Sequence, residues 1–184
     1  GEGKPSPFFV HHAASPRRRP GSPTANVTEP SSQAPLPPTL VLDTNTVLAL
    51  WMFRDPALET LRAWIDAGSC RLVSRADALE ELRRVLAYAQ FGLDPDRQDG
   101  LRTRYLARIA VLANDADAGT LPGCRDPDDQ KFLEIAGAAG MATLITRDKA
   151  LLRLARHRLV RERFAILTPE RMQQTLAQPD EKPT

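Results

Sequence analysis

The chain is poor in cysteine and in long apolar runs, and each shortage excludes a class of protein. Its two cysteines, Cys70 and Cys124, lack the paired spacing of a zinc site or a redox motif, which favours two reduced thiols. No apolar run approaches the roughly 18 residues that span a membrane. The N-terminal region also lacks the apolar segment of a secretory signal. We therefore expect a cytoplasmic protein without a membrane segment.

A strong excess of charge of either sign is also missing. The formal net charge of the 184 residues is +2, so overall charge does not identify a nucleic-acid binder. Apolar residues make up 42% and charged residues 26%, which is ordinary for a soluble globular protein. Aromatic residues reach only 5%, and the sequence shows no aromatic platform on which nucleic-acid bases could stack.

Proline is concentrated at the start of the chain. Residues 1–38 hold more than half of the sixteen prolines, among Ser, Ala, Gly and Thr. Such a segment cannot repay its ordering entropy by burial, which predicts a disordered tail; its basic cluster, Arg17–Arg19, is expected to be solvated. Because the chain does not begin with Met, part of this tail could be foreign to the natural protein. We expect one folded domain at 39–178 and a flexible C-terminus at 179–184.

From Leu40 onward, strand-like and helical patterns alternate. Apolar runs typical of strands occur at Leu40–Leu42, Arg71–Ser74, Ala142–Thr146 and Phe164–Leu167. Four of the helical segments begin with a cap residue and then proline, at Asp55-Pro56, Asp94-Pro95, Asp126-Pro127 and Thr168-Pro169. This alternation predicts a three-layer α/β/α fold with a central parallel sheet of about four to five strands and a Rossmann-like topology.

Two acidic residues fall at the ends of predicted strands. Asp43 follows Leu40–Leu42, and Asp148 comes two residues after Thr146. In open parallel sheets, ligands bind at this carboxyl edge. A carboxylate beside a buried strand is costly unless something pairs with it, although either residue could instead cap the helix that follows. Thr44 and Asn45 could hydrogen-bond Asp43 and fix its orientation.

Helical periodicity separates two adjacent glutamates, Glu80 and Glu81. The helix expected from about Arg75 to Ala89 carries one apolar stripe. Glu81 lies about 90° from the centre of that stripe and Glu80 about 170°. We therefore expect Glu80 to face solvent. Glu81 flanks the buried face, where it is either a boundary charge or a side chain that looks into a cleft.

The tetrapeptide Asp126-Pro127-Asp128-Asp129 is a strong helix start. Asp126 suits the cap position, and acids in the first turn complement the helix dipole. Capping therefore explains Asp126 without a metal. Periodicity does not choose between Asp128 and Asp129 as the residue that faces a cleft, because both flank the apolar stripe of the following helix.

These acids can converge on one cleft at the edge of the predicted sheet. Clustered carboxylates repel one another and would not all stay ionised unless a cation neutralised them. Hard divalent cations such as Mg²⁺ and Mn²⁺ choose oxygen-only sites of this kind. The pattern therefore indicates metal-dependent chemistry on phosphodiesters.

Four segments, in this order, resemble the PIN domain, a family of metal-dependent nucleases. They are Leu42–Asn45, Leu79–Leu86, Arg125–Leu133 and Leu144–Leu151. The resemblance covers about residues 39–170 and is strongest to the bacterial branch of ribonuclease toxins from toxin–antitoxin systems. In the family pattern the third acid precedes apolar residues at the third and fourth positions after it. Asp129 meets this condition, whereas Asp128 is followed at the third position by Lys131.

The resemblance implies a metal-dependent endoribonuclease. The catalytic and metal-binding positions of the family are taken by Asp43, Glu81, Asp129 and Asp148, with Asp126 as an additional candidate ligand. Polar support is implied for Asn45 and Thr146. The resemblance also implies Mg²⁺ or Mn²⁺ as cofactor, RNA as substrate, a cognate antitoxin protein as partner, and a homodimer.

Basic residues in the C-terminal third could hold the phosphates of RNA. The principal candidates are Arg147, Lys149 and Arg153, followed by Arg156, Arg158, Arg161 and Arg163. Phosphate contacts would make binding salt-dependent but blind to sequence, and the alternative is an ordinary solvated helix face. No histidine lies inside the motifs, so the metal would have to generate the nucleophile. His157 is expected at the surface.

Two other functions share part of this pattern. A PIN-like fold could hold RNA or a protein without cutting, although the four intact acids argue against that reading. A phosphatase of the haloacid-dehalogenase type would form an intermediate on Asp43. That chemistry requires a second acid two residues later, where this chain has Asn45.

Overall fold

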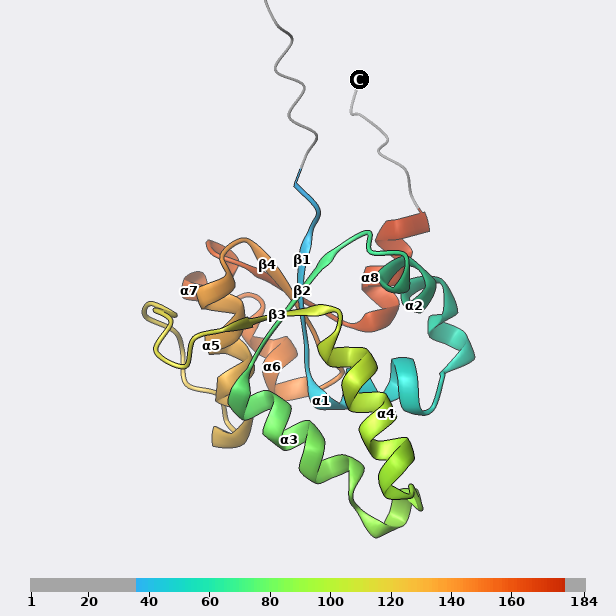
Figure 1. The fold of residues 1–184 in the computed structure, drawn as a ribbon. Coiled ribbons are helices and arrows are strands. Elements are labelled where there is room, and N and C mark those ends of the chain that lie inside the picture. The colour runs from blue at the N-terminus through green and yellow to red at the C-terminus, as the bar shows by residue number, and fades with distance from the viewer. Residues whose placement is uncertain (1–35, 178–184) are drawn as a thin grey trace, which may run out of the picture. The chain divides into compact units, whose positions relative to one another are not determined.

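The apolar runs of the sequence become strands of one parallel sheet (Figure 1). The computed structural model describes residues 36–177. The four predicted strands are present as β1 (Thr39–Leu42), β2 (Arg71–Arg75), β4 (Ala142–Ile145) and β5 (Ala165–Leu167). The fifth strand, β3 (Ile109–Leu112), was not predicted individually.

β3 is an edge strand that follows a helix almost directly. Helix α4 (Pro95–Leu106) ends two residues before it, and no glycine or proline separates the two. A short apolar run in that position cannot be told from the end of the helix by periodicity. Pairing with β2 decides its conformation, from Leu72↔Ile109 to Arg75↔Leu112.

The strand order is β3-β2-β1-β4-β5, and every pair is parallel. The chain moves outward from β1 to β3 and then returns to the other side of β1. The order therefore reverses between β1 and β4, where Leu42 is level with Ile145. Such a switch point leaves a crevice beyond the carboxyl ends of the two strands.

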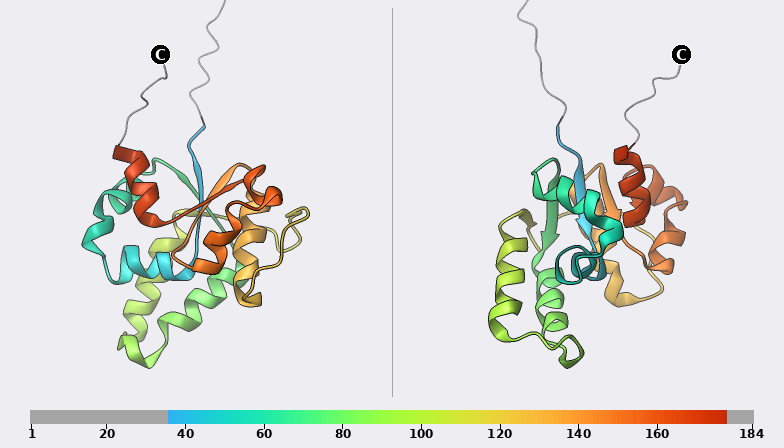
Figure 2. Two further views of the ribbon diagram at one scale, coloured as in Figure 1. Left: turned by 180° about the vertical axis from the view of Figure 1, so that it is seen from behind. Right: turned by 90° about the vertical axis from the view of Figure 1, so that its right-hand side faces the viewer.

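Helices cover both faces of the sheet (Figures 1 and 2). Alternate residues of the central strands belong to two separate core layers. Leu40 and Leu42 face one layer and Val41 the other. The first layer contains α1 (Thr44–Val47), η1 (Leu48–Met52), α2 (Glu59–Asp66), α4 and α8 (Pro169–Ala177). The second contains α5 (Gln130–Ala139), α6 (Lys149–Leu154) and α7 (Arg158–Arg161). The predicted three-layer α/β/α architecture is confirmed.

Helix α3 (Ala76–Leu86) lies beyond the carboxyl edge of the sheet and contacts both layers. Ala78 packs in the core with α5, whereas Leu82 and Leu86 pack in the core with α1 and α4. This position directs one flank of α3 toward the β1–β4 crevice.

The four cap–proline signals all begin helical elements. Asp55 caps the 3₁₀ turn η2 (Pro56–Leu58), which leads into α2, and Asp94 caps α4. Asp126 caps the 3₁₀ turn η4 (Pro127–Asp129), which leads into α5, and Pro169 begins α8. In each case the missing N–H of proline falls where a helix has no acceptor for it.

Part of the predicted organisation lies outside the described residues. This applies to the tail up to residue 35, including Arg17–Arg19, and to the C-terminus from residue 178. Within residues 36–177, no helix combines the length and the apolar character that crossing a bilayer requires.

Candidate active site

An acidic cleft of about 310 Å³ lies at the carboxyl ends of β1 and β4. The four predicted acids all line it, and they are Asp43, Glu81, Asp129 and Asp148. Asp128 is a fifth lining carboxylate, whereas Asp126 is not among the lining residues. Four different elements thus bring the principal candidates together. Their roles in metal binding and catalysis stay a prediction.

Asp43 is the most deeply buried of these acids, with 5% of its surface exposed. It directly follows β1 and caps α1, because its Oδ1 accepts a hydrogen bond of 2.7 Å from the N–H of Thr46. Its Oδ2 accepts one of 2.5 Å from the hydroxyl of Thr146. Burial raises the pKa of Asp43, the two hydrogen bonds lower it in part, and the charge of Asp148 raises it again. The predicted polar support from Thr146 is therefore present as a contact.

Asp148 also serves as a helix cap. Its Oδ1 accepts hydrogen bonds from the N–H groups of Ala150 and Leu151, at 2.7 and 2.9 Å. Its own N–H donates to the hydroxyl of Thr146 at 2.9 Å. Asp43 and Asp148 are therefore helix caps, as one of the two interpretations of the sequence predicted. Each cap fixes a carboxylate at the rim of the cleft.

Asp129 has no capping role. The side chain that caps η4 is Asp126, whose Oδ1 accepts from the N–H of Asp128. Burial raises the pKa of Asp129 to about 6, and the charges of Asp148, Asp126, Asp43 and Glu81 act in the same direction. Asp129 is half-buried and is repelled by the negative charges of four other acids, so a cation beside it is favoured.

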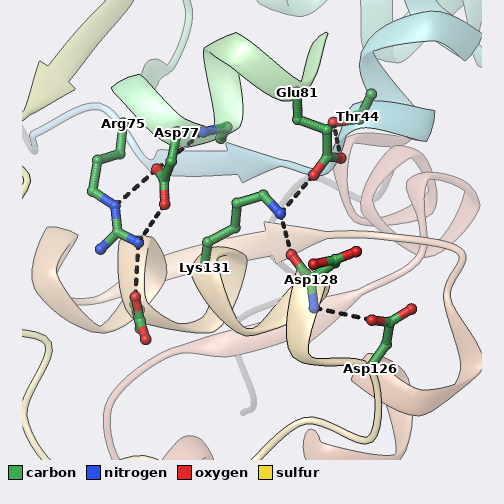
Figure 3. A network of polar contacts seen from close by, with 9 residues as sticks. Thr44, Arg75, Asp77, Glu81, Asp126, Asp128 and Lys131 are labelled. Carbon is green, nitrogen blue, oxygen red and sulfur yellow. Dashed lines mark hydrogen bonds and ion pairs between the residues drawn. The ribbon is translucent and has the colours of Figure 1, made fainter. Parts of the chain in front are cut away.

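Glu81 is held by two partners that come from different elements (Figure 3). Thr44 donates its hydroxyl to Oε1 at 2.6 Å, and the ammonium of Lys131 lies 2.5 Å from Oε2. The neighbouring Glu80 is exposed and pairs with Arg83 on the same helix. The prediction from periodicity is confirmed, since Glu80 faces solvent and Glu81 faces the cleft.

The predicted hydrogen bonds from Thr44 and Asn45 to Asp43 were wrong. Within the described part of the chain, neither residue donates to Asp43, and Thr44 donates to Glu81 instead. The reason is the helical turn after Asp43. It brings the N–H of Thr46 back toward the cap carboxylate and turns Asn45 outward, where it is exposed but still lines the cleft.

Sequence reasoning missed Lys131 as the partner of Glu81, and Arg84 and Tyr88 as parts of the cleft wall. Arg84 and Tyr88 line the cleft, and both are exposed. The ring of Tyr88 stacks on that of Phe91, with centroids 6.4 Å apart and an angle of 15° between the planes. For Arg84 the available signal was its position three residues after Glu81, because this spacing keeps residues on one helix face. Tyr88 lies beyond the end of α3 at Leu86, where helical spacing no longer applies.

The predicted phosphate-binding residues do not act as one group. Arg147 is held by two acids, with its guanidinium 3.0 Å from Asp55 and 2.5 Å from Glu170. Lys149 and Arg153 are exposed and line a separate hollow beside α6. His157 is exposed, as expected, and caps α7. Arg147 thus links the end of β4 to η2 and α8, and its role as a phosphate ligand stays a prediction.

A larger groove, of about 910 Å³, lies between α2 and α4. It mixes arginines with aspartates, and some of them pair directly, such as Arg108 with Asp66 at 3.1 Å. Because arginines lie beside the aspartates and neutralise them, carboxylates in this groove do not repel one another strongly. The smaller acidic cleft is therefore the better candidate for a cation site.

The donor chemistry of the acidic cleft fits a hard divalent ion. Its acids supply oxygen ligands only. Burial raises the pKa of Asp129, and the like charges of the neighbouring acids raise it further. As the side chains stand within residues 36–177, no three of the His, Cys, Asp and Glu groups point at one common position. Asp43, Glu81 and Asp148 are instead turned to internal donors. To ligate one ion jointly, these side chains would have to turn from their present donors toward the cleft.

Comparisons with known proteins gave a matching family model and several similar solved structures. A family model described as "PIN domain" matches residues 39–150. A search of curated protein sequences gave no match. Among solved structures, VapBC2 from Rickettsia felis bound to a DNA fragment from their promoter is 15% identical, with a TM-score of 0.46 over 71% of this chain and 98% of that chain. The PIN domain of T. brucei RRP44 is 16% identical, with a TM-score of 0.39 over 76% of this chain and 79% of that chain.

Proposed function

The chain belongs to the PIN-domain family, and we propose that it is a metal-dependent endoribonuclease that hydrolyses RNA phosphodiester bonds. One observation carries the proposal. Four carboxylates from separate elements line one cleft at the switch point of a parallel sheet, and the pKa of Asp129 is raised to about 6 by burial and by the other acids.

The residues that would hold the ion are Asp43, Asp129 and Asp148, and the ion would be Mg²⁺ or Mn²⁺. A divalent ion bound there lowers the pKa of a coordinated water and stabilises charge on the leaving oxygen. Glu81 lines the same cleft and completes the predicted set. Asp126 acts on this site through its charge and through the cap of η4.

The remaining contacts of the cleft hold these carboxylates in place. Thr146 and Thr46 orient Asp43, and the first N–H groups of α6 orient Asp148. No histidine is among the residues that line the cleft in the described part of the chain. Proton transfer within the cleft therefore falls to carboxylates and water.

The substrate side of the cleft offers one cation and one aromatic ring. Arg84 can contact a phosphate of the RNA backbone, and Tyr88 can stack on an exposed base. Bases are accessible for stacking in single-stranded RNA and not in a duplex. These residues support single-stranded RNA as the substrate.

A role as the toxin of a toxin–antitoxin pair belongs to the same proposal. It is supported by the resemblance of the four motif segments to the bacterial toxin branch. An antitoxin would cover the acidic cleft, and the toxin would form a homodimer. Induced expression in a bacterial host should then arrest growth, and the Asp43→Asn protein should not. Light scattering of the purified protein measures its oligomeric state.

Cleavage of a labelled single-stranded RNA tests the enzymatic core of the proposal. Activity should require Mg²⁺ or Mn²⁺ and disappear in EDTA. Asp43→Asn and Asp129→Asn should each lower the rate on the order of 100-fold or more. Glu80→Gln is the matched control, because Glu80 neighbours Glu81 but faces solvent. A protein that binds RNA without cutting it, at any metal concentration, would instead be a binding module.

A further inference from the structure

Lys131 places a positive charge against Glu81, one of the carboxylates that line the acidic cleft (Figure 3). Its side chain is 13% exposed, and its ammonium lies 2.5 Å from Oε2 of Glu81. The ammonium also donates to the backbone carbonyl of Asp128 and lies 5.2 Å from the ring centroid of Phe132. Three partners thus hold one lysine in a single position.

The location of Lys131 is unfavourable for a lysine in general. It lies in the first turn of α5, where the helix dipole disfavours a cation. Partial burial adds a desolvation cost that an unpaired ammonium could not offset. The pairing with Glu81 compensates for both effects. Lys131 and Glu81 therefore form a unit, since either charge alone would be poorly placed.

Glu81 has both of its carboxylate oxygens engaged by this arrangement. Oε1 accepts from Thr44 at 2.6 Å, and Oε2 faces Lys131. A second divalent ion bound at Glu81 would lie within about 7 Å of the ammonium, given metal–oxygen distances of about 2.1 Å. Like charges at that distance repel strongly in a partly buried site.

We propose that Lys131 takes the place of a second metal ion, so that the cleft holds one divalent ion on Asp43, Asp129 and Asp148. Glu81 then acts as the partner of Lys131 and not as a direct ligand. The inference rests on the metal site of the proposed function and adds the number of ions and the residue that sets it.

Charge counting gives the same answer. The five acids that line the cleft carry five negative charges when ionised, and Arg84 and Lys131 reduce the excess to three. One divalent ion leaves a single negative charge, whereas two ions would leave the site positive. Without Lys131, two ions would match the remaining excess of four negative charges.

Titration with Mn²⁺ in the absence of RNA measures the number of ions directly. By calorimetry, the wild-type protein should bind one ion, and Lys131→Met should bind two. Lys149→Met is the matched control, because Lys149 is exposed and lines the separate hollow beside α6; it should bind one. Lys131→Arg keeps the charge and should also bind one. Two ions in the wild type, or one in Lys131→Met, would overturn the proposal.

A second variant keeps the proposal testable if Lys131→Met folds poorly. The double variant Glu81→Gln/Lys131→Met removes the ion pair without changing the net charge. It should still bind one ion, with an affinity within about threefold of the wild type, because Glu81 is not a ligand. A loss of tenfold or more would assign Glu81 to the ion and contradict the proposal. Binding without RNA also separates this inference from the proposed function. One bound ion without cleavage would defeat only the function, and cleavage with two bound ions would defeat only the inference.

Discussion

The hydroxyl of Thr146 lies 2.5 Å from Oδ2 of Asp43 and joins the end of β4 to the end of β1. The hydroxyl oxygen of Thr146 also accepts a hydrogen bond of 2.9 Å from the N–H of Asp148. Thr146 is fully buried, so neither contact competes with water. One threonine therefore orients two carboxylates of the candidate metal site, and it does so across the switch point of the sheet.

Replacing Thr146 by valine should weaken both the fold and the site. The isosteric change leaves a buried carboxylate oxygen without its donor, which should lower the free energy of unfolding by about 1–3 kcal/mol. It should also lower the Mn²⁺ affinity by roughly tenfold. Urea unfolding and calorimetric titration measure the two effects. Thr146→Ser keeps the hydroxyl and should retain most of both; equal losses in serine and valine would show that packing, and not the hydrogen bond, matters.

Asp129→Asn should stabilise the metal-free protein at neutral pH. The folded-state pKa of Asp129 is about 6, above its ordinary 3.8. The folded state therefore binds the proton more tightly, and stability falls as the pH rises from about 4 to about 6. At pH 7.5 the asparagine variant should be more stable by about 1–2 kcal/mol, a value discounted for the partial exposure of Asp129. Near pH 4 the difference should vanish.

Urea unfolding of both proteins in metal-free buffer across this pH range checks the result. Saturating Mn²⁺ should reverse the order, because only the wild type gains the full stabilisation from ion binding. Without metal at pH 7.5, Glu80→Gln should not be more stable than the wild type, since it only removes the exposed pair with Arg83. A lower stability of the Asp129 variant at pH 7.5 without metal would contradict a raised pKa of Asp129 in the folded protein.

Arg147→Ala should affect stability slightly and RNA binding hardly at all. The guanidinium bridges Asp55 and Glu170 at the surface, and exposed pairs of this kind contribute at most about 1 kcal/mol each. Arg84→Ala should show the opposite pattern, with unchanged stability and weaker RNA binding. Thermal unfolding and a filter-binding assay on the same preparations separate the two. A marked loss of RNA affinity in Arg147→Ala would restore it as a phosphate ligand.

Tyr88→Ala should weaken the binding of single-stranded RNA by roughly tenfold, because a stacked base contributes about 1–3 kcal/mol. Tyr88 is 52% exposed, so its truncation should leave the fold intact. Tyr88→Phe keeps the ring and should bind as the wild type does. Fluorescence anisotropy in an Asp43→Asn background measures binding without cleavage. Equal binding of single-stranded and duplex RNA by all three proteins would refute a stacking role.

Local patterns in the sequence were sufficient for much of the fold and for one part of the site. Buried strands read as apolar runs, and proline after a cap residue marked the helix starts, because both signals depend on near neighbours. Helical periodicity alone also predicted that Glu80 faces solvent and that Glu81 flanks the buried face. Asp129 was separated from Asp128 only by the family pattern, since both flank one apolar stripe.

The chain order by itself determined that acids would fall at strand ends, because a parallel sheet collects its carboxyl ends on one edge. Only the tertiary structure decided which side chains meet there. The contact of Thr146 with Asp43 spans 103 residues, and that of Thr44 with Glu81 spans 37. The pairing of Lys131 with Glu81 joins two helices, and Arg147 pairs with both Asp55 and Glu170. Such contacts depend on how α3, α5 and α8 dock on the sheet, and no local periodicity encodes the docking.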